Sequence, residues 1–178
     1  MGIHPENFTF RLKNDEPFQA PEVIHSYSAN GFEKLSHNMH DIIRNHLFRG
    51  KYKTAQRPVL INNWEATYFK FDQEKILSLA KKAKSIGVEL MVLDDGWFGK
   101  RDSDNCSLGD WVVDKRKLPN GLEELCKSVN DLGMQFGLWF EPEMISRDSQ
   151  LYTMHPDWCI HCRDAMPIES RQQMVLDM

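Results

Sequence analysis

Apolar and polar residues follow two different patterns along the chain, one before and one after the basic stretch Lys51 to Arg57. In the first part, Phe8 to Leu12 alternates between apolar and polar residues, and Phe18 to Ser28 predicts a second strand. Two strands do not form a stable sheet alone, so we expect both to belong to a larger sheet whose other strands are not in this chain. Phe32 to Phe48 then carries apolar residues close to helical spacing, which predicts a connecting helix.

In the second part, short apolar runs alternate with helical stripes. Pro58 to Trp64 is the first predicted strand, and Val88 to Leu93, interrupted only by Glu89, predicts a second strand that is buried on both faces. A helix is predicted between them, with Asp72 as its N-cap. Its apolar face is formed by Ile76, Leu77, Ala80, Ala83 and Ile86.

The same alternation continues toward the end of the chain. Asn120 is predicted to cap a second helix, with Glu123 three residues later as in a capping box. Met134 to Phe140 predicts a third strand. After a loop with a short helix around residues 151–157, Gln173 to Met178 predicts a fourth strand.

Strands that alternate with helices predict a parallel α/β fold with right-handed crossovers. No Gly-x-Gly-x-x-Gly sequence follows the first strand and no Gly-rich lysine loop is present, which argues against a nucleotide-binding sheet. A (β/α)8 TIM barrel fits better, although such a barrel needs about 250 residues. We therefore expect residues 51–178 to form the N-terminal half of a barrel, and the sequence to be a fragment.

Polar and aromatic residues follow every predicted strand, while the strand interiors stay apolar. The carboxyl ends of parallel strands meet on one face, where barrels hold their ligand sites. For the tryptophans of the first and third exits, packing at the top of the barrel is the alternative. A glutamate of the third exit is a candidate catalytic acid or a partner for an arginine of the fold. The exit residues are Asn62, Asn63 and Trp64; Asp94, Asp95 and Trp97; Trp139, Glu141 and Glu143; and Asp177.

The adjacent carboxylates Asp94 and Asp95 are the most informative pair in the sequence. They would repel each other unless a ligand, a cation or hydrogen-bond donors held them, and capping of the loop is the alternative. Trp97 and Phe98 beside them favour a polyhydroxylated ligand. Carboxylates accept hydrogen bonds from sugar hydroxyls, and aromatic faces stack on the C–H face of a sugar ring.

The composition argues against several classes of protein. A net charge of −4 with 27% charged residues leaves no electrostatic footprint for nucleic acid or a membrane surface. The chain has no apolar run of about 18 residues and begins without the features of a signal peptide. The 4 cysteines are then expected to stay reduced. We therefore expect a soluble cytoplasmic protein.

The sequence does not favour a metal site. Structural zinc needs four ligands, and the candidate residues near the end of the chain lack a second pair at matching spacing. These candidates are Cys159, His161 and Cys162, with His155 nearby. The histidines of the predicted connecting helix are scattered around its wheel and are interpreted as surface residues: His37, His40 and His46.

Several motifs resemble the retaining α-galactosidases of glycoside hydrolase family 36. They are INNWEA at residues 61–66, VLDDGWFG at 92–99, GDWVVD at 109–114, GLWFEPEMIS at 137–146, HPDW at 155–158 and SRQQMVLDM at 170–178. Their order and spacing over residues 57–178 make the resemblance specific. Residues 1–50 resemble the end of that family's N-terminal β-supersandwich domain and the linker helix into its catalytic barrel.

The resemblance implies a galactose pocket. Trp64 and Trp139 would form its walls, and Arg171 would reach toward the sugar hydroxyls. Asp94 and Asp95 would accept hydrogen bonds from the 4- and 6-hydroxyls, and so would select the axial 4-hydroxyl of galactose. No cofactor or metal is implied. The implied partner is a small α-galactoside, and the full-length protein is expected to be a homo-oligomer, a tetramer.

The catalytic carboxylates of that family are not in this chain. Its nucleophile ends a lysine-tryptophan-aspartate stretch and its acid/base is a later aspartate, and neither motif occurs here. Retaining hydrolysis needs two carboxylates about 5–5.5 Å apart. Two hypotheses therefore stay open: part of an α-galactosidase that cleaves melibiose or raffinose by double displacement, or a truncated, inactive sugar-binding fragment. A third, which the pattern favours least, is a metal-dependent barrel hydrolase that uses Asp94, Asp95, Glu141 and His155.

Overall fold

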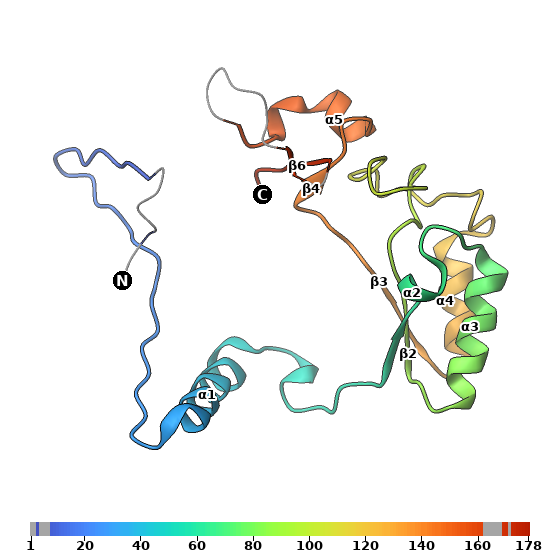
Figure 1. Ribbon diagram of the computed structural model, residues 1–178, viewed down its shortest axis with the longest axis horizontal. Helices are drawn as coiled ribbons and strands as arrows, with labels where there is room; N and C mark the ends of the chain where they lie inside the picture. Colours follow the sequence, from blue (N-terminus) through green and yellow to red (C-terminus); the bar gives the residue numbers. More distant parts are fainter. Residues whose placement is uncertain (1–2, 4–7, 162–168, 171) are drawn as a thin grey trace. The chain divides into compact units, whose positions relative to one another are not determined.

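The computed structural model describes residues 3, 8–161, 169–170 and 172–178 of the 178-residue chain. The chain divides into two compact units, residues 1–57 and residues 58–178. Figure 1 traces both units from the N-terminus in blue to the C-terminus in red. In the described residues, no helix is long and apolar enough to cross a membrane.

The regular secondary structure in the described part of the first unit is helical. Helix α1 (Gly31–Ile42) continues as a π-helical segment, η1 (Ile43–Leu47), and a short 3-10 helix, η2 (Lys51–Lys53), follows. The expected connecting helix is therefore confirmed. Its three histidines lie on exposed positions, as expected for surface residues: His37, His40 and His46.

The strands expected at Phe8 to Leu12 and Phe18 to Ser28 are wrong, since residues 8–30 contain no strand. An extended segment becomes a strand only when its N–H and C=O groups pair with a neighbouring backbone. These two segments instead meet through their rings, with the Phe18 centroid 4.5 Å from that of Phe10. Leu12 stays 66% exposed, so the alternation has no buried face here. Membership of residues 1–50 in a β-sandwich domain stays a prediction.

The second unit is built on a parallel sheet. Its strands are β1 (Leu60–Asn62), β2 (Leu90–Leu93) and β3 (Gln135–Leu138), in the order β1-β2-β3. Ile61 pairs with Met91, and Met91 pairs with Phe136, so the three strands stay in register to their carboxyl ends. This arrangement confirms the expected parallel α/β fold in its first three strands.

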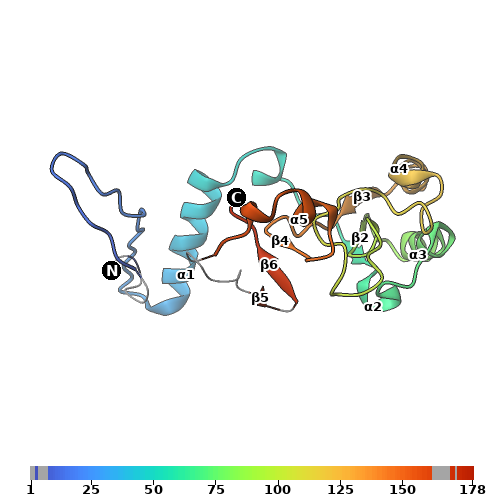
Figure 2. The same cartoon turned by 90° about the horizontal axis from the view of Figure 1, so that it is seen from above.

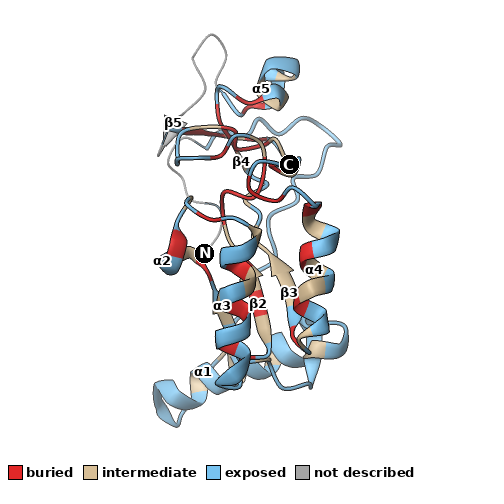
Figure 3. Cartoon of the chain, turned by 90° about the vertical axis from the view of Figure 1, so that its right-hand side faces the viewer, coloured by how far each residue is buried: buried red, intermediate tan, exposed pale blue. Residues whose placement is uncertain are grey.

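Two helices cover one face of this sheet. They are α3 (Gln73–Ser85) and α4 (Gly121–Asp131), which lie side by side in Figures 1 and 2. Their buried positions, red in Figure 3, include Ile76 and Leu125, which pack with Met91 and Leu93 of β2 in one core. All four are 0% exposed. Burial of a side chain of this size contributes about 1.5–3 kcal/mol, which anchors β2 between its neighbours.

The prediction that Gln173 to Met178 forms a fourth parallel strand is wrong. The segment forms β6 (Gln173–Val175), which pairs antiparallel with β4 (Met144–Ile145) and β5 (Glu169–Ser170) in a second sheet. Between β3 and β6 the described chain forms β4, α5 (Gln150–Met154) and the 3-10 helix η3 (Pro156–Trp158). Pairing with β4 and β5 satisfies backbone N–H and C=O groups of β6, which therefore belongs to this second sheet and not to the parallel one.

The two predicted helix caps differ in the structure. The Asp72 side chain accepts a hydrogen bond from the Lys75 N–H at 2.8 Å, as an N-cap should. Asn120 occupies the N-cap position of α4, but its side chain makes no capping hydrogen bond, so the expected capping box is absent. Its backbone has helical dihedral angles, φ −88 and ψ −3, rather than the extended ones that aim a cap side chain back at the helix.

This difference gives a paired prediction. Asp72→Ala should lower the free energy of unfolding by about 1 kcal/mol, because it leaves an N–H of the first turn without its partner. Asn120→Ala, the matched control, should change it by less than about 0.5 kcal/mol. Urea unfolding and hydrogen exchange at the Lys75 amide measure both effects. Equal losses in the two variants would show that the Asp72 cap contributes nothing specific.

Candidate functional site

The exits of the first three predicted strands gather at one end of the parallel sheet. The fourth predicted exit residue, Asp177, instead follows β6 in the antiparallel sheet. Hydrogen bonds extend the ladder past the strands: Asn63 N–H donates to the Val92 carbonyl at 3.4 Å, and Trp139 N–H donates to the Leu93 carbonyl at 2.9 Å. The residues after β1, β2 and β3 are thereby held beside one another. They surround a pocket of about 390 Å³ lined by Trp64, Asp94, Asp95, Asp104, Trp139, Phe140, Glu141 and Glu143.

Asp94 is held by two asparagines at the carboxyl end of β1, the last residue of the strand and the residue after it. The Asn62 side-chain amide donates to Asp94 Oδ2, and Asn63 Oδ1 accepts the Asp94 N–H at 2.8 Å. Asp94 Oδ1 accepts the N–H of Asp95 at 2.6 Å. Asn63 is itself buried and donates to the Thr67 hydroxyl oxygen at 2.8 Å. The Asp94 carboxylate is therefore oriented by neighbouring strands yet remains half-buried at the pocket wall.

Asp95 has a different environment, because it is buried and paired with an arginine. Arg101 Nε donates to Asp95 Oδ1 at 3.0 Å and to Oδ2 at 3.2 Å, and Nη2 donates to Oδ2 at 2.9 Å. The two residues are only 5% and 1% exposed. The fork offsets part of the cost of removing both charges from water, and it gives the two adjacent carboxylates different partners.

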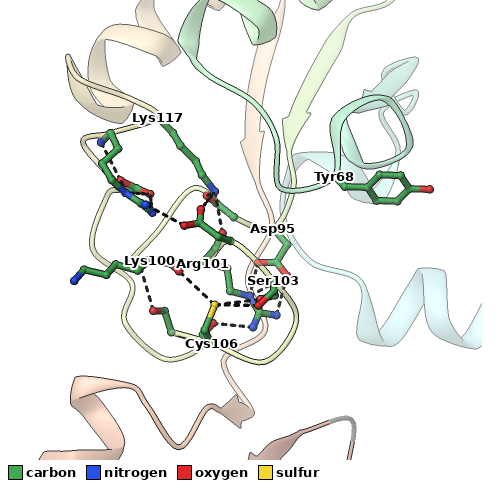
Figure 4. Close-up of polar contacts among 12 residues, drawn as sticks. Tyr68, Asp95, Lys100, Arg101, Ser103, Cys106 and Lys117 are labelled. Carbon is green, nitrogen blue, oxygen red and sulfur yellow. Dashed lines mark hydrogen bonds and ion pairs between the residues drawn. The ribbon is translucent and has the colours of Figure 1, made fainter.

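The loop between β2 and α4 is tied to this ion pair, as Figure 4 shows. Arg101 Nη1 donates to the backbone carbonyls of Asp104 and Cys106 at 2.8 and 2.9 Å. Lys117 Nζ donates to the carbonyls of Gly96 and Arg101, both at 2.9 Å. Two buried cations therefore fix the loop from opposite ends.

A second group of charges lies on the outer side of the same loop. Arg116 bonds to Asp114 at 2.6 Å and to Asp102 at 2.9 Å. Partial burial raises the pKa of Asp102, but hydrogen bonds from Arg116 and Lys117 outweigh it and hold the pKa below its usual value. This contribution to stability is present at neutral pH and is lost as the pH falls through the lowered pKa.

The two predicted tryptophans both line the pocket. Trp64, in α2 (Trp64–Thr67), is held edge to face by Tyr68 and Phe69, with centroids 5.2 and 5.0 Å away. The Trp139 carbonyl accepts the indole N–H of Trp97 at 3.1 Å. Both Trp64 and Trp139 remain partly exposed, and Trp139 also packs against the hydrophobic core.

Arg171 and Cys162 lie outside the described residues. Among the residues that the structure describes, no group of three or more His, Cys, Asp or Glu side chains is placed to hold a metal ion. His155 stacks on Trp158 with centroids 4.0 Å apart, and it is not among the residues that line the pocket. This placement disfavours the hypothesis of a metal site that combines His155 with the strand-exit carboxylates.

The sequence pattern assigned no role to Arg101, Lys117 or Asp104. All three lie between the second predicted strand and the second predicted helix. Burial is the property that distinguishes the two cations, at 1% and 8% exposed, and the apolar pattern carries no signal for a buried arginine. The glycines and aromatic residues after Asp95 indicate a turn at this point, but they do not indicate that Arg101 and Lys117 hold the loop by hydrogen bonds.

Comparison with known proteins identifies close relatives. The profile of the Melibiase family matches residues 17–178. Alpha-galactosidase AgaA from Geobacillus stearothermophilus is 55% identical over 177 residues, which cover 99% of this chain and 24% of AgaA. The bifunctional alpha-galactosidase/sucrose kinase AgaSK from Mediterraneibacter gnavus is 52% identical over 177 residues, covering 99% of this chain and 19% of AgaSK.

Solved structures agree with the sequence matches. The GH36 alpha-galactosidase AgaB from Geobacillus stearothermophilus superposes with a TM-score of 0.92 at 56% identity, covering 99% of this chain and 24% of AgaB. A variant of AgaA in complex with raffinose gives the same TM-score of 0.92 at 55% identity, again with 99% and 24% coverage. The expected fold class, part of a (β/α)8 barrel, is confirmed. The chain spans about a quarter of the length of AgaA and AgaB.

A pair of glycine variants tests how tightly the turn after Asp95 is packed. At Gly96 (φ +97) a Cβ would lie 3.1 Å from Phe69 Cδ1, 3.3 Å from the Arg101 carbonyl oxygen and 3.4 Å from Lys117 Nζ. At Gly87 (φ +92) no described atom lies within 4 Å of the Cβ position. Alanine should cost about 1–2 kcal/mol at either position because of the left-handed backbone.

At Gly96 crowding should add about 1 kcal/mol or more to that cost. Urea unfolding of Gly96→Ala and Gly87→Ala compares the two directly, because both share the backbone penalty. A Gly96→Ala variant no less stable than Gly87→Ala would contradict the tight packing of the turn under the pocket.

Proposed function

The chain belongs to the melibiase family, and on this premise we propose that it forms the galactose-binding portion of a retaining α-galactosidase. The complete enzyme would remove terminal α-galactose from oligosaccharides such as melibiose and raffinose. The observation that supports this best is the pocket at the strand ends, where carboxylates and two tryptophans converge. A hexose ring presents hydroxyls around its rim and C–H groups on its faces, and these residue types complement both.

The division of roles follows from the environments of the carboxylates. Asp94 is half-buried, and its two oxygens accept hydrogen bonds from Asn62 and from the Asp95 N–H. A carboxylate has about four acceptor sites, so Asp94 retains capacity for sugar hydroxyls. Asp95 retains less, because Arg101 already donates to both of its oxygens. We therefore assign Asp94 the main contact with the 4- and 6-hydroxyls and Asp95 a secondary one.

Trp64 and Trp139 would form the walls that exclude water and stack on the ring. Arg171 would donate to the sugar hydroxyls, a role that rests on the family resemblance alone. The nucleophile and the acid/base would come from residues outside these 178, since the motifs that carry them in the family are not in this sequence. For the complete enzyme we also propose a cytoplasmic location and a homotetramer, again on the resemblance.

The kinetic test uses a chimera in which this chain replaces the matching quarter of AgaA. Asp94→Asn should lower kcat/KM on an α-galactoside by about ten- to a hundredfold, because it replaces charge-assisted acceptors with a neutral amide. Asp95→Asn should also lower it. Asp94→Asn should lose more activity on α-galactosides than on any residual α-glucoside activity, because the axial 4-hydroxyl distinguishes the two sugars. Both kcat and KM should change, since these contacts act in the transition state as well.

Asp131→Asn is the matched control, because Asp131 lies in α4 with its side chain 63% exposed and paired with Lys127 at the surface. It should leave kcat/KM unchanged. The 178-residue chain alone should release no galactose. Wild-type kinetics in the Asp94→Asn chimera would mean that Asp94 only caps its loop. Turnover by the isolated chain would assign catalysis to the carboxylates present here.

A further inference from the structure

Arg101 is a long, charged side chain that is almost completely buried, at 1% exposed. Its guanidinium makes two kinds of contact. Nε and Nη2 donate to the Asp95 carboxylate, whereas Nη1 donates to the backbone carbonyls of Asp104 and Cys106. Asp95 and Asp104 both line the pocket, so one guanidinium contacts two separate segments of its wall. Figure 4 shows Arg101 between Asp95 and the turn that carries Ser103 and Cys106.

Stability alone does not account for a buried ion pair. Removal of two charges from water costs as much as, or more than, the pair recovers, so apolar residues of similar volume often serve a fold as well or better. What the fork supplies is geometry: two parallel N–H···O bonds fix the plane and position of the carboxylate. Lys117 reinforces this arrangement by donating to the Arg101 carbonyl at 2.9 Å, which restrains the backbone that carries the guanidinium.

We propose that Arg101 is a positioning residue of the galactoside pocket. It acts on the sugar through Asp95, whose carboxylate it holds in one orientation, and its bonds to the Asp104 and Cys106 carbonyls hold the guanidinium itself in place. The inference rests on the proposed function of this pocket. Specificity for the sugar would then depend on Arg101, although Arg101 does not itself line the pocket.

Lysine should not replace Arg101, even though it keeps the charge. An ammonium group is a single point charge, whereas the planar guanidinium reaches Asp95 on one side and the two carbonyls on the other. In the chimera with AgaA, Arg101→Lys and Arg101→Gln should each lower kcat/KM on an α-galactoside by roughly tenfold or more. The ratio of α-galactoside to α-glucoside activity should shift in the same direction as in Asp95→Asn, which a general loss of stability would not produce.

A double-mutant cycle tests whether Arg101 affects kcat/KM through Asp95. If Arg101 acts through Asp95, the Asp95→Asn/Arg101→Gln double variant should lose no more than about threefold beyond Asp95→Asn alone. Arg116→Lys and Arg116→Gln are the matched controls. Arg116 makes the same kind of fork with Asp114 in the same loop, but neither residue lines the pocket. These controls should leave the ratio of activities unchanged.

The outcomes separate this inference from the proposed function. An active chimera that loses activity in Asp94→Asn supports the proposed function, whatever Arg101 does. The positioning role would be overturned if the loss of kcat/KM in the double variant equalled the product of the losses in Asp95→Asn and Arg101→Gln. An unchanged ratio of α-galactoside to α-glucoside activity in Arg101→Lys would also overturn it. Loss of the folded state in both Arg101 variants, monitored by thermal unfolding, would also overturn it, because the role would then be structural.

Discussion

Parallel pairing of β1, β2 and β3 is the constraint on which the site depends. Parallel strands end at the same edge of a sheet, so residues that lie about 30 and 45 positions apart in the sequence become neighbours (Asn62, Asp94 and Trp139). The ladder continues one residue past the strands through Asn63 and Trp139, which donate to carbonyls of β2. Backbone hydrogen bonds alone therefore place the residues of the pocket wall beside one another.

Side chains then decide what this edge can bind. Asn62 and Asn63 fix Asp94 from the neighbouring strand, and Arg101 fixes Asp95 from the loop. Two adjacent carboxylates would repel each other in an apolar site, and these separate partners remove that conflict. One carboxylate stays available at the surface of the pocket, while the other is committed to an ion pair. The same loop carries Asp102, whose pKa is lowered by hydrogen bonds from Arg116 and Lys117. These bonds stabilise the fold at neutral pH, and the stabilisation is lost as the pH falls through that lowered pKa.

The sequence predicted correctly those features that depend on residues close to one another in the chain. The stripe that contains Ile76 and Ala80, the apolar run before Asp94 and the cap at Asp72 all involve contacts within one element or its immediate packing, and the structure has them. Ile86, predicted for the same stripe, instead lies at the C-cap of α3 and is 80% exposed. Trp64, Asp94, Asp95 and Trp139 line one pocket, as expected for residues at the carboxyl ends of three parallel strands. Their roles in binding stay a prediction.

Features that depend on distant partners were not predictable in the same way. Residues 8–28 alternate like strands but find no backbone to pair with, and Gln173 to Val175 pairs with β4 rather than beside β3. Arg101 lies only six residues from Asp95, yet its burial depends on the fold of the whole loop. Asn120 precedes a helix as a cap should, but its local dihedral angles turn the side chain away from that role.

The central claim is that the strand ends form a pocket for a galactose ring. The most direct measurement is a crystal structure of the chimera with a galactose analogue that is not hydrolysed. The account predicts the ring between Trp64 and Trp139, with a hydroxyl donating to the Asp94 carboxylate while Asp95 remains in the fork of Arg101. An analogue bound elsewhere, with Asp94 accepting hydrogen bonds from its own loop and from Asn62 alone, would contradict it.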